Sequence, residues 1–109
     1  MPFVKPIEFL GDSLVRVREF PKGARRAAGY QLDRVQRGLE ADDWKPMKAV
    51  GAGVRELRIR DRSGAFRVFY LATLADRIVV LHAFQKKTQR TAKHDIDLAA
   101  RRFRDLRKD

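Results

Sequence analysis

The sequence contains no cysteine and only two histidines among its 109 residues. The absence of cysteine excludes disulfide bonds and thiolate metal sites, and it is compatible with a reducing cytoplasm. His82 and His94 are too isolated to suggest a metal site. We therefore expect a protein that holds no metal.

Long apolar runs are also missing. The longest run is far too short to span a bilayer, and the segment from Met1 to Lys5 lacks the apolar stretch of a signal peptide. There is no glycine-rich phosphate loop, because Gly51-Ala52-Gly53 lacks the lysine and the following helix of such loops. We expect a cytoplasmic protein that has no membrane as a partner.

Positive charge is what the sequence has in excess. Lys and Arg number 25 against 14 Asp and Glu, which gives a formal net charge of +11. Residues 1–50 carry 10 basic and 7 acidic side chains, whereas residues 51–109 carry 15 and 7. Such an excess costs stability through self-repulsion and is typical of proteins that bind a polyanion. We expect the C-terminal half to bind it.

Apolar residues make up 44% of the chain, which is enough for a packed core, and the length fits a single domain over residues 1–109. Hydrophobic periodicity and turn residues predict the order β-α-α-β-β-β-α. This order predicts a compact α+β fold in which the helices pack on one face of a mostly antiparallel, twisted sheet. The elements are expected over residues 6–10, 12–19, 22–40, 54–60, 66–74, 77–84 and 93–107, with residues 41–53 as a loop.

Strand alternation places arginines on one face of the predicted sheet. In the strands over 54–60 and 66–74, apolar side chains alternate with arginines, so Arg58, Arg60 and Arg67 are expected together on the uncovered side. A guanidinium donates two parallel hydrogen bonds to phosphate oxygens. Any one of these arginines is explained as a solvated surface position, but a cluster of three is unfavourable without an anion. The trio predicts a phosphate site.

A basic segment follows the last predicted strand. Residues 84–93 contain four cations and no acid, and they precede a helix N-terminus, which itself favours anions. Most basic runs are solvated loops, and only the position beside the arginines favours a binding role here. His82 alternates with Val80 and Phe84 in the strand, which favours a hydrogen-bonded structural role, and His94 favours a solvated or RNA-facing one.

Three segments resemble the phage-derived, HigB-like branch of the RelE/ParE toxin superfamily. They are residues 54–58 (VRELR), 64–70 (GAFRVFY) and 81–91 (LHAFQKKTQRT), and the last is similar to the family signature LHAFxKKTxxT. The similarity extends over nearly the whole chain. It implies a RelE-like fold, a cytoplasmic location and a toxin of a type II toxin–antitoxin system that a cognate antitoxin protein neutralises.

The resemblance further implies a metal-independent endoribonuclease that needs no cofactor. Such toxins cleave mRNA, typically on translating ribosomes, and so inhibit translation. The messenger's 2′-hydroxyl attacks the adjacent phosphate, and the enzyme orients the strand, assists proton transfer and stabilises the extra negative charge. mRNA and the ribosome are therefore the expected partners besides the antitoxin.

The resemblance also implies site residues. Arg58 and Arg60 match basic strand residues at the scissile site, Arg67 matches the arginine that stabilises the phosphate, and Lys86 and Lys87 match a basic pair that supplies an acid or a phosphate contact. These five are the expected catalytic residues. The residues expected to bind RNA around them are Arg55, Arg62, Thr88, Gln89, Arg90 and Lys93.

Two positions depart from the family pattern. Phe66 stands where many relatives have tyrosine, which removes a hydroxyl, although its predicted face is the core. Ala92 stands where many have proline, which loosens the start of the last helix. Neither departure argues strongly against activity.

Two other functions stay open. The superfamily includes ParE-like toxins that inhibit DNA gyrase and lack a ribonuclease site, so the fold does not fix the target. Composition and patterning alone predict only a polyanion-binding domain, which leaves a non-catalytic nucleic-acid-binding module as the other alternative. The joint presence of the five expected catalytic residues favours the endoribonuclease.

Overall fold

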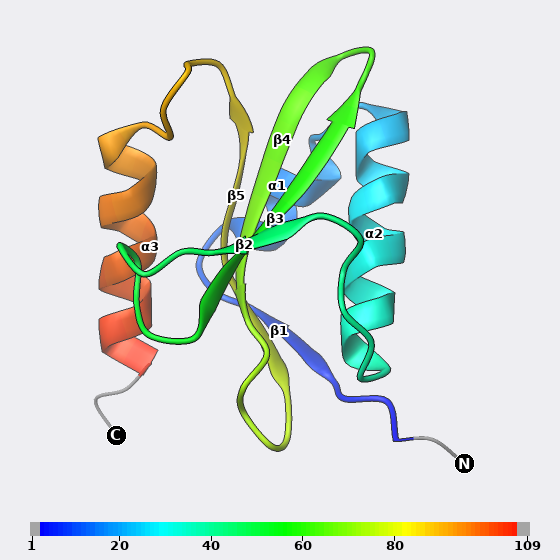
Figure 1. The fold of residues 1–109 in the computed structure, drawn as a ribbon, viewed down its shortest axis with the longest axis vertical. Helices are drawn as coiled ribbons and strands as arrows, with labels where there is room; N and C mark the ends of the chain where they lie inside the picture. The colour runs from blue at the N-terminus through cyan, green and yellow to red at the C-terminus, as the bar shows by residue number, and fades with distance from the viewer. Residues whose placement is uncertain (1–2, 107–109) are drawn as a thin grey trace.

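The computed structural model describes residues 3–106 of the chain. Five strands and three helices follow one another in this part, and Figure 1 shows the sheet between α3 on one side and α1 and α2 on the other. The elements are β1 (Ile7–Phe9), α1 (Ser13–Arg18), α2 (Lys22–Gln36), β2 (Trp44–Pro46), β3 (Val54–Asp61), β4 (Gly64–Leu71), β5 (Ile78–Lys86) and α3 (Lys93–Leu106).

The strands form one sheet in the order β1-β5-β4-β3-β2. β1 pairs with β5 in parallel, and the three other pairings are antiparallel. The predicted α+β class with a mostly antiparallel sheet is therefore confirmed. None of the helices within residues 3–106 has the length and apolar character needed to cross a membrane.

The helices do not all lie on one face, and this part of the prediction was wrong. The first apolar cluster joins Ala24, Ala28 and Leu32 of α2 to Leu57 and Val68 of the sheet. A second cluster joins α3 to the opposite face, through the residues Ala99, Phe103, Phe69, Leu71 and Val79. The reason is that β4 and most of β5 are buried continuously, so both faces of these strands need an apolar cover.

A short edge strand replaces part of the predicted loop over residues 41–53. Trp44 pairs with Leu57, and Pro46 pairs with Arg55. Three residues that include a proline give almost no strand signal in the sequence, and proline is tolerated only at an edge such as this one. The preceding helix ends at Gln36 rather than near Glu40, because Gly38 adopts a φ of 84° and leads the chain out of the helix.

β5 contains a bulge that strand alternation did not predict. Phe69 pairs with His82 and Tyr70 pairs with Val80, so Leu81 stands opposite no residue of β4. His82 stacks on Phe84, with 5.2 Å between the ring centroids, on the side of α3. Val80 belongs instead to the cluster under α1 and α2. The bulge therefore turns His82 toward α3, which the expected alternation with Val80 does not do.

Candidate nucleic-acid interface

Arginines of β3 and β4 meet on the face that α3 covers in part. Arg58 stands directly opposite Arg67 in the register of the two strands, and Arg60 stands opposite Ala65. Ala65 in turn pairs with Lys86 at the end of β5. α3 packs over the other end of this face through Ala99 and Phe103. The predicted grouping of arginines on one face is therefore present at the end of the sheet where the β3–β4 turn lies.

A cleft of about 440 Å³ opens at this end, and we refer to it as the basic cleft. It brings together six of the residues predicted from the sequence, from the three strands β3, β4 and β5 and from the loop after β5. The residues that line it are Arg60, Asp61, Gly64, Ala65, Arg67, Lys86, Lys87, Thr88 and Gln89. Four cations against one carboxylate make the cleft a suitable site for a phosphate group.

Arg67 is the most buried cation of the cleft, with 2% of its surface exposed. Its Nε lies 3.6 Å from Oε2 of Glu56, which is itself 5% exposed, and its terminal nitrogen donates to the carbonyl of Phe66 at 3.0 Å. Burial lowers the pKa of Arg67, Glu56 opposes this, and Arg58 and Arg60 add to it. Arginine stays charged despite such a shift, so the cleft holds a fixed positive charge at its base.

Arg58 lies beside the cleft rather than in its lining. It is half-buried, and its Nε is buried without a hydrogen-bond partner among residues 3–106. Arg60 is exposed, as is Lys87, and Lys86 is half-buried. The cations of this site thus divide into a buried one, Arg67, two half-buried ones, Arg58 and Lys86, and two exposed ones, Arg60 and Lys87.

Four of the residues predicted to bind RNA lie outside the cleft. Arg55 is on the opposite face of β3, where its guanidinium sits 3.8 Å from the ring centroid of Trp44. Arg55 therefore lies away from the cleft, because alternation sends residue 55 to the side of Leu57. Arg62 and Arg90 are exposed in the turn after β3 and in the loop after β5. Lys93 pairs with Asp97 at 2.9 Å.

The loop between β5 and α3 is fixed by its hydroxyl groups. Thr88 Oγ1 donates a hydrogen bond to the carbonyl of Arg90. Thr91 Oγ1 lies 3.4 Å from Oε2 of Glu56, the same oxygen that faces Arg67. Glu56 therefore connects the buried arginine to the loop that forms one wall of the cleft. The sequence analysis missed this role. The signal that could have indicated it is that Glu56 lies on the same face of β3 as Arg58 and Arg60.

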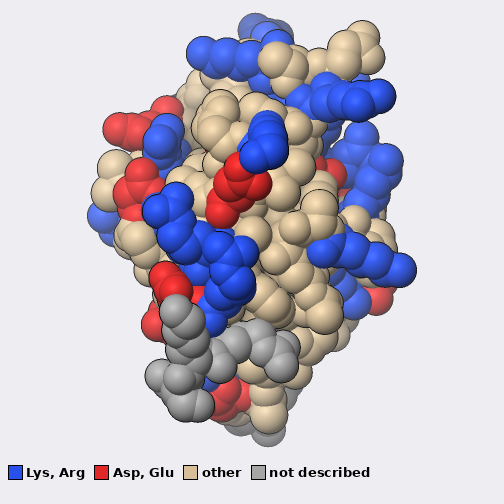
Figure 2. All heavy atoms as spheres, turned by 90° about the vertical axis from the view of Figure 1, so that its left-hand side faces the viewer, with Lys and Arg blue, Asp and Glu red and all other residues tan. Residues whose placement is uncertain are grey.

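Figure 2 views the side of the molecule that α3 covers. Lys and Arg side chains gather at its upper end, where the β3–β4 turn and the loop after β5 lie, and basic and acidic side chains mix over its middle. Lys and Arg side chains thus surround the cleft end of this side, and others lie lower down among acidic ones.

The chain was also compared with known families. The family model described as phage-derived protein Gp49-like (DUF891) matches residues 16–104. The chain belongs to this family. Gp49-like proteins are RelE-like toxins. A search of curated proteins found no significant match to the chain.

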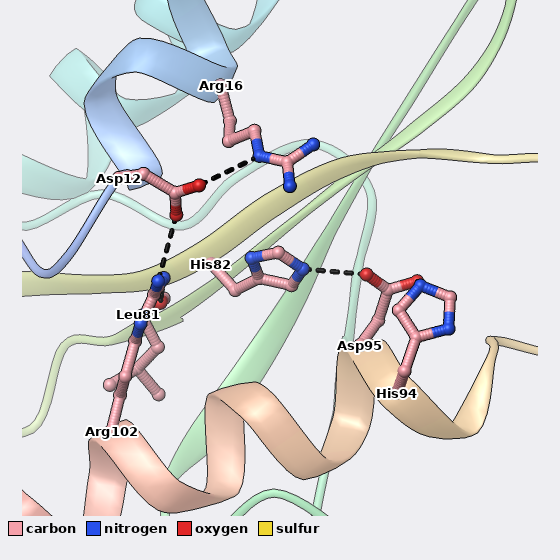
Figure 3. Close-up of polar contacts among 7 residues, drawn as sticks. All are labelled: Asp12, Arg16, Leu81, His82, His94, Asp95 and Arg102. Atoms are coloured by element: carbon pink, nitrogen blue, oxygen red, sulfur yellow. Dashed lines mark hydrogen bonds and ion pairs between the residues drawn. The ribbon is translucent and has the colours of Figure 1, made fainter.

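A second polar network ties α3 of this Gp49-like protein to β5 and α1 (Figure 3). His82, which is 1% exposed, places Nε2 at 2.7 Å from Oδ1 of Asp95, and His94 lies 3.5 Å from the other oxygen. Arg102 donates to the carbonyl of Leu81 and to Asp12, each at 2.8 Å. Hydrogen bonds from Arg102 and Arg16 lower the pKa of Asp12 to about 2. The predicted hydrogen-bonded role of His82 is confirmed.

This network borders a second cavity of about 440 Å³, on the other side of the segment Lys86–Thr88 from the basic cleft. His82, His94 and Asp95 contribute to its lining, together with the aromatic rings of Phe20 and Phe84. His94 is exposed, in line with its predicted solvated position. Neither histidine lines the basic cleft.

His82 makes the stability of the Gp49-like fold depend on pH. Burial lowers its pKa from 6.5, Asp95 opposes this, and Arg102 and Arg16 add to it. The unfolded chain then binds the proton more readily than the folded one, so this stability is complete above pH 6.5 and is lost as the pH falls toward the lowered pKa. We expect the urea concentration at the midpoint of unfolding to be lower at pH 5.5 than at pH 7.5, because this one side chain binds its proton more readily in the unfolded chain.

Two variants separate His82 from other titrating groups. His82→Gln should reduce the difference between the two midpoints by more than the matched variant His94→Gln, which replaces an exposed histidine. An equal pH dependence in the His82→Gln protein and the unsubstituted one would contradict this assignment.

Proposed function

We propose that this chain is the toxin of a type II toxin–antitoxin system and that it is an endoribonuclease which cleaves mRNA, in association with the ribosome, and so inhibits translation. The observation that carries the proposal is the basic cleft, in which Arg60, Arg67, Lys86 and Lys87 line one cavity. Membership of a family of RelE-like toxins supports the same reaction. The mechanism assigns no step to a metal or a cofactor.

In the proposed reaction the cleft binds the phosphodiester to be cleaved. The 2′-hydroxyl of the preceding nucleotide loses its proton to solvent and attacks the phosphorus, and the bond to the 5′-oxygen of the next nucleotide breaks. The products are a 2′,3′-cyclic phosphate and a free 5′-hydroxyl. Negative charge grows on the phosphate oxygens in the transition state, so donors fixed in advance at this position accelerate the step.

The residues of the cleft divide this work. Arg67 is held in place by Glu56 and supplies a preorganised positive charge at the base of the site. Arg60 and Lys86 reach the phosphate from the rim, and one ammonium of the pair Lys86 and Lys87 is the candidate that donates a proton to the leaving 5′-oxygen. Thr88 and Gln89 provide hydrogen bonds that orient the strand.

The same cleft is the surface that a neutralising antitoxin needs to cover. An antitoxin segment with acidic side chains would satisfy the rim cations and exclude RNA by occupying the same space. This makes RNA binding and antitoxin binding mutually exclusive.

The proposal is tested by inducing the protein in cells and mapping the 5′ ends of messenger RNA. We expect new 5′ ends at recurring positions within codons, together with arrest of protein synthesis. Arrest with DNA-damage signalling and without new 5′ ends would show a gyrase-directed toxin instead. Absence of both effects would leave a non-catalytic nucleic-acid-binding module.

A further inference from the structure

A second group of cations lies outside the basic cleft, where α1 ends and α2 begins. Arg18, Lys22, Arg25 and Arg26 are all exposed, and Arg62 is exposed in the β3–β4 turn. None of these five forms an ion pair with an acidic side chain within residues 3–106. We refer to them as the basic band.

The position of the basic band on α2 is electrostatically unfavourable for the free protein. The N-terminus of a helix carries partial positive charge and favours anions. α2 nevertheless has no acidic residue in its first turn and no side-chain hydrogen bond at its N-cap, while Lys22 and Arg25 occupy that end. Arg34, near the other end of α2, is instead paired with Asp42 at 3.7 Å. Lys22 and Arg25 form no ion pair within residues 3–106, although the carboxylate of Asp61 packs against Gly23 at this end, so they are suited to an anionic partner.

The β3–β4 turn connects the basic band to the basic cleft. Asp61 packs so closely on the start of α2 that a Cβ at Gly23 would lie 2.9 Å from its Oδ2. Asp61 also accepts a hydrogen bond from the backbone of Ser63 at 2.8 Å. This contact holds the turn, with Arg60 on one side of Asp61 and Arg62 on the other, against the start of α2. Figure 1 shows the turn, the start of α2 and the loop after β5 at the same end of the molecule.

We propose that the basic band extends the RNA-binding surface out of the cleft, over the β3–β4 turn and onto the start of α2, where it binds the phosphate backbone of the same or a neighbouring RNA strand. The inference rests on the proposed function, because it takes the cleft as the site of the reacting phosphate. Exposed cations that contact only the phosphates bind the RNA backbone without regard to its sequence. Tyr30, which is 59% exposed on α2, lies one turn beyond Arg26 and offers a ring on which a base can stack.

The test compares a short and a long RNA, about four and about twenty nucleotides, chosen to fit one binding site or to exceed it. Both are 2′-O-methyl oligouridines, which lack the attacking hydroxyl and are not cleaved. Binding is measured by fluorescence anisotropy over a range of salt concentrations. The variant replaces Lys22, Arg25 and Arg26 by alanine, and the matched control replaces three exposed cations far from the band, Lys48, Arg101 and Arg104.

For the long RNA, the band variant should lower the slope of log affinity against log salt by about 2, because each lost phosphate contact on a single strand contributes about 0.7. The short RNA should bind to the band variant with the same affinity as to the unsubstituted protein. The control removes the same net charge, and its slopes for both RNAs should stay close to those of the unsubstituted protein. Equal slopes for the band variant and the control would overturn the band and leave the cleft intact. If the unsubstituted protein bound neither RNA, the proposed function would fail together with the band.

Discussion

Replacing Arg67 with alanine should lower the free energy of unfolding by about 3–5 kcal/mol, which is the usual cost of removing one partner of a buried ion pair. Glu56 would be left 5% exposed with its carboxylate facing an empty space, and the hydroxyl of Thr91, at 3.4 Å, is only a weak substitute for a guanidinium. The measurement is a urea unfolding curve followed by circular dichroism. The midpoint should fall while the slope of the transition stays the same.

A paired substitution distinguishes the uncompensated charge from the lost volume. Replacing Arg67 by Met and Glu56 by Leu together removes both charges and keeps an apolar filling, and such exchanges of buried pairs are often nearly neutral. The double variant should therefore be more stable than Arg67→Ala alone. If Arg67→Ala unfolded at the midpoint of the unsubstituted protein, Glu56 and Arg67 would not form the buried pair described above.

Substitution of the rim cations should have the opposite profile, with a large effect on activity and little on stability. Arg60→Ala and Lys86→Ala should each lower the rate of messenger cleavage by about 100-fold or more, the cost of removing one preorganised donor from the transition state. Both side chains lie at the surface of the cleft, so the free energy of unfolding should change by less than about 0.5 kcal/mol. Cleavage is measured in an assay of purified protein with programmed ribosomes.

Lys48→Ala is the matched control for these variants, because Lys48 is an exposed cation in the loop before β3, at the opposite end of that strand from Arg60. It removes the same charge and should leave the cleavage rate unchanged. A loss of cleavage in the control equal to that of Arg60→Ala would show that net charge, rather than the cleft, determines activity.

The two predictions together separate positioning from catalysis. Loss of activity on replacing Arg67 would by itself be ambiguous, because the same change unfolds part of the wall of the cleft through Glu56 and Thr91. Loss of activity on replacing Arg60 or Lys86 would not be ambiguous in this way, because both side chains lie at the surface of the cleft. For this reason the rim cations are better probes of the proposed reaction than the arginine that the family resemblance places at the phosphate.

The sequence predicted the features that depend on neighbouring residues. Alternation in the strands placed Arg58, Arg60 and Arg67 on the face opposite to Leu57 and Val68, and the register of β3 and β4 agrees. Helical spacing predicted the buried stripe of α2 through Ala24, Ala28 and Leu32, all of which belong to the core. These patterns repeat every two or every few residues, so a short stretch of chain is enough to define them.

The tertiary structure decided what depends on contacts distant in the sequence. Only packing shows that α3 covers the face opposite to α1 and α2, that a bulge turns His82 toward Asp95, and that Glu56 pairs with Arg67. The sequence by itself determined which side chains share a face of a strand or helix, because that follows from local backbone geometry. Which faces meet, and therefore which cations stay free to bind a phosphate, was decided only when the elements packed together.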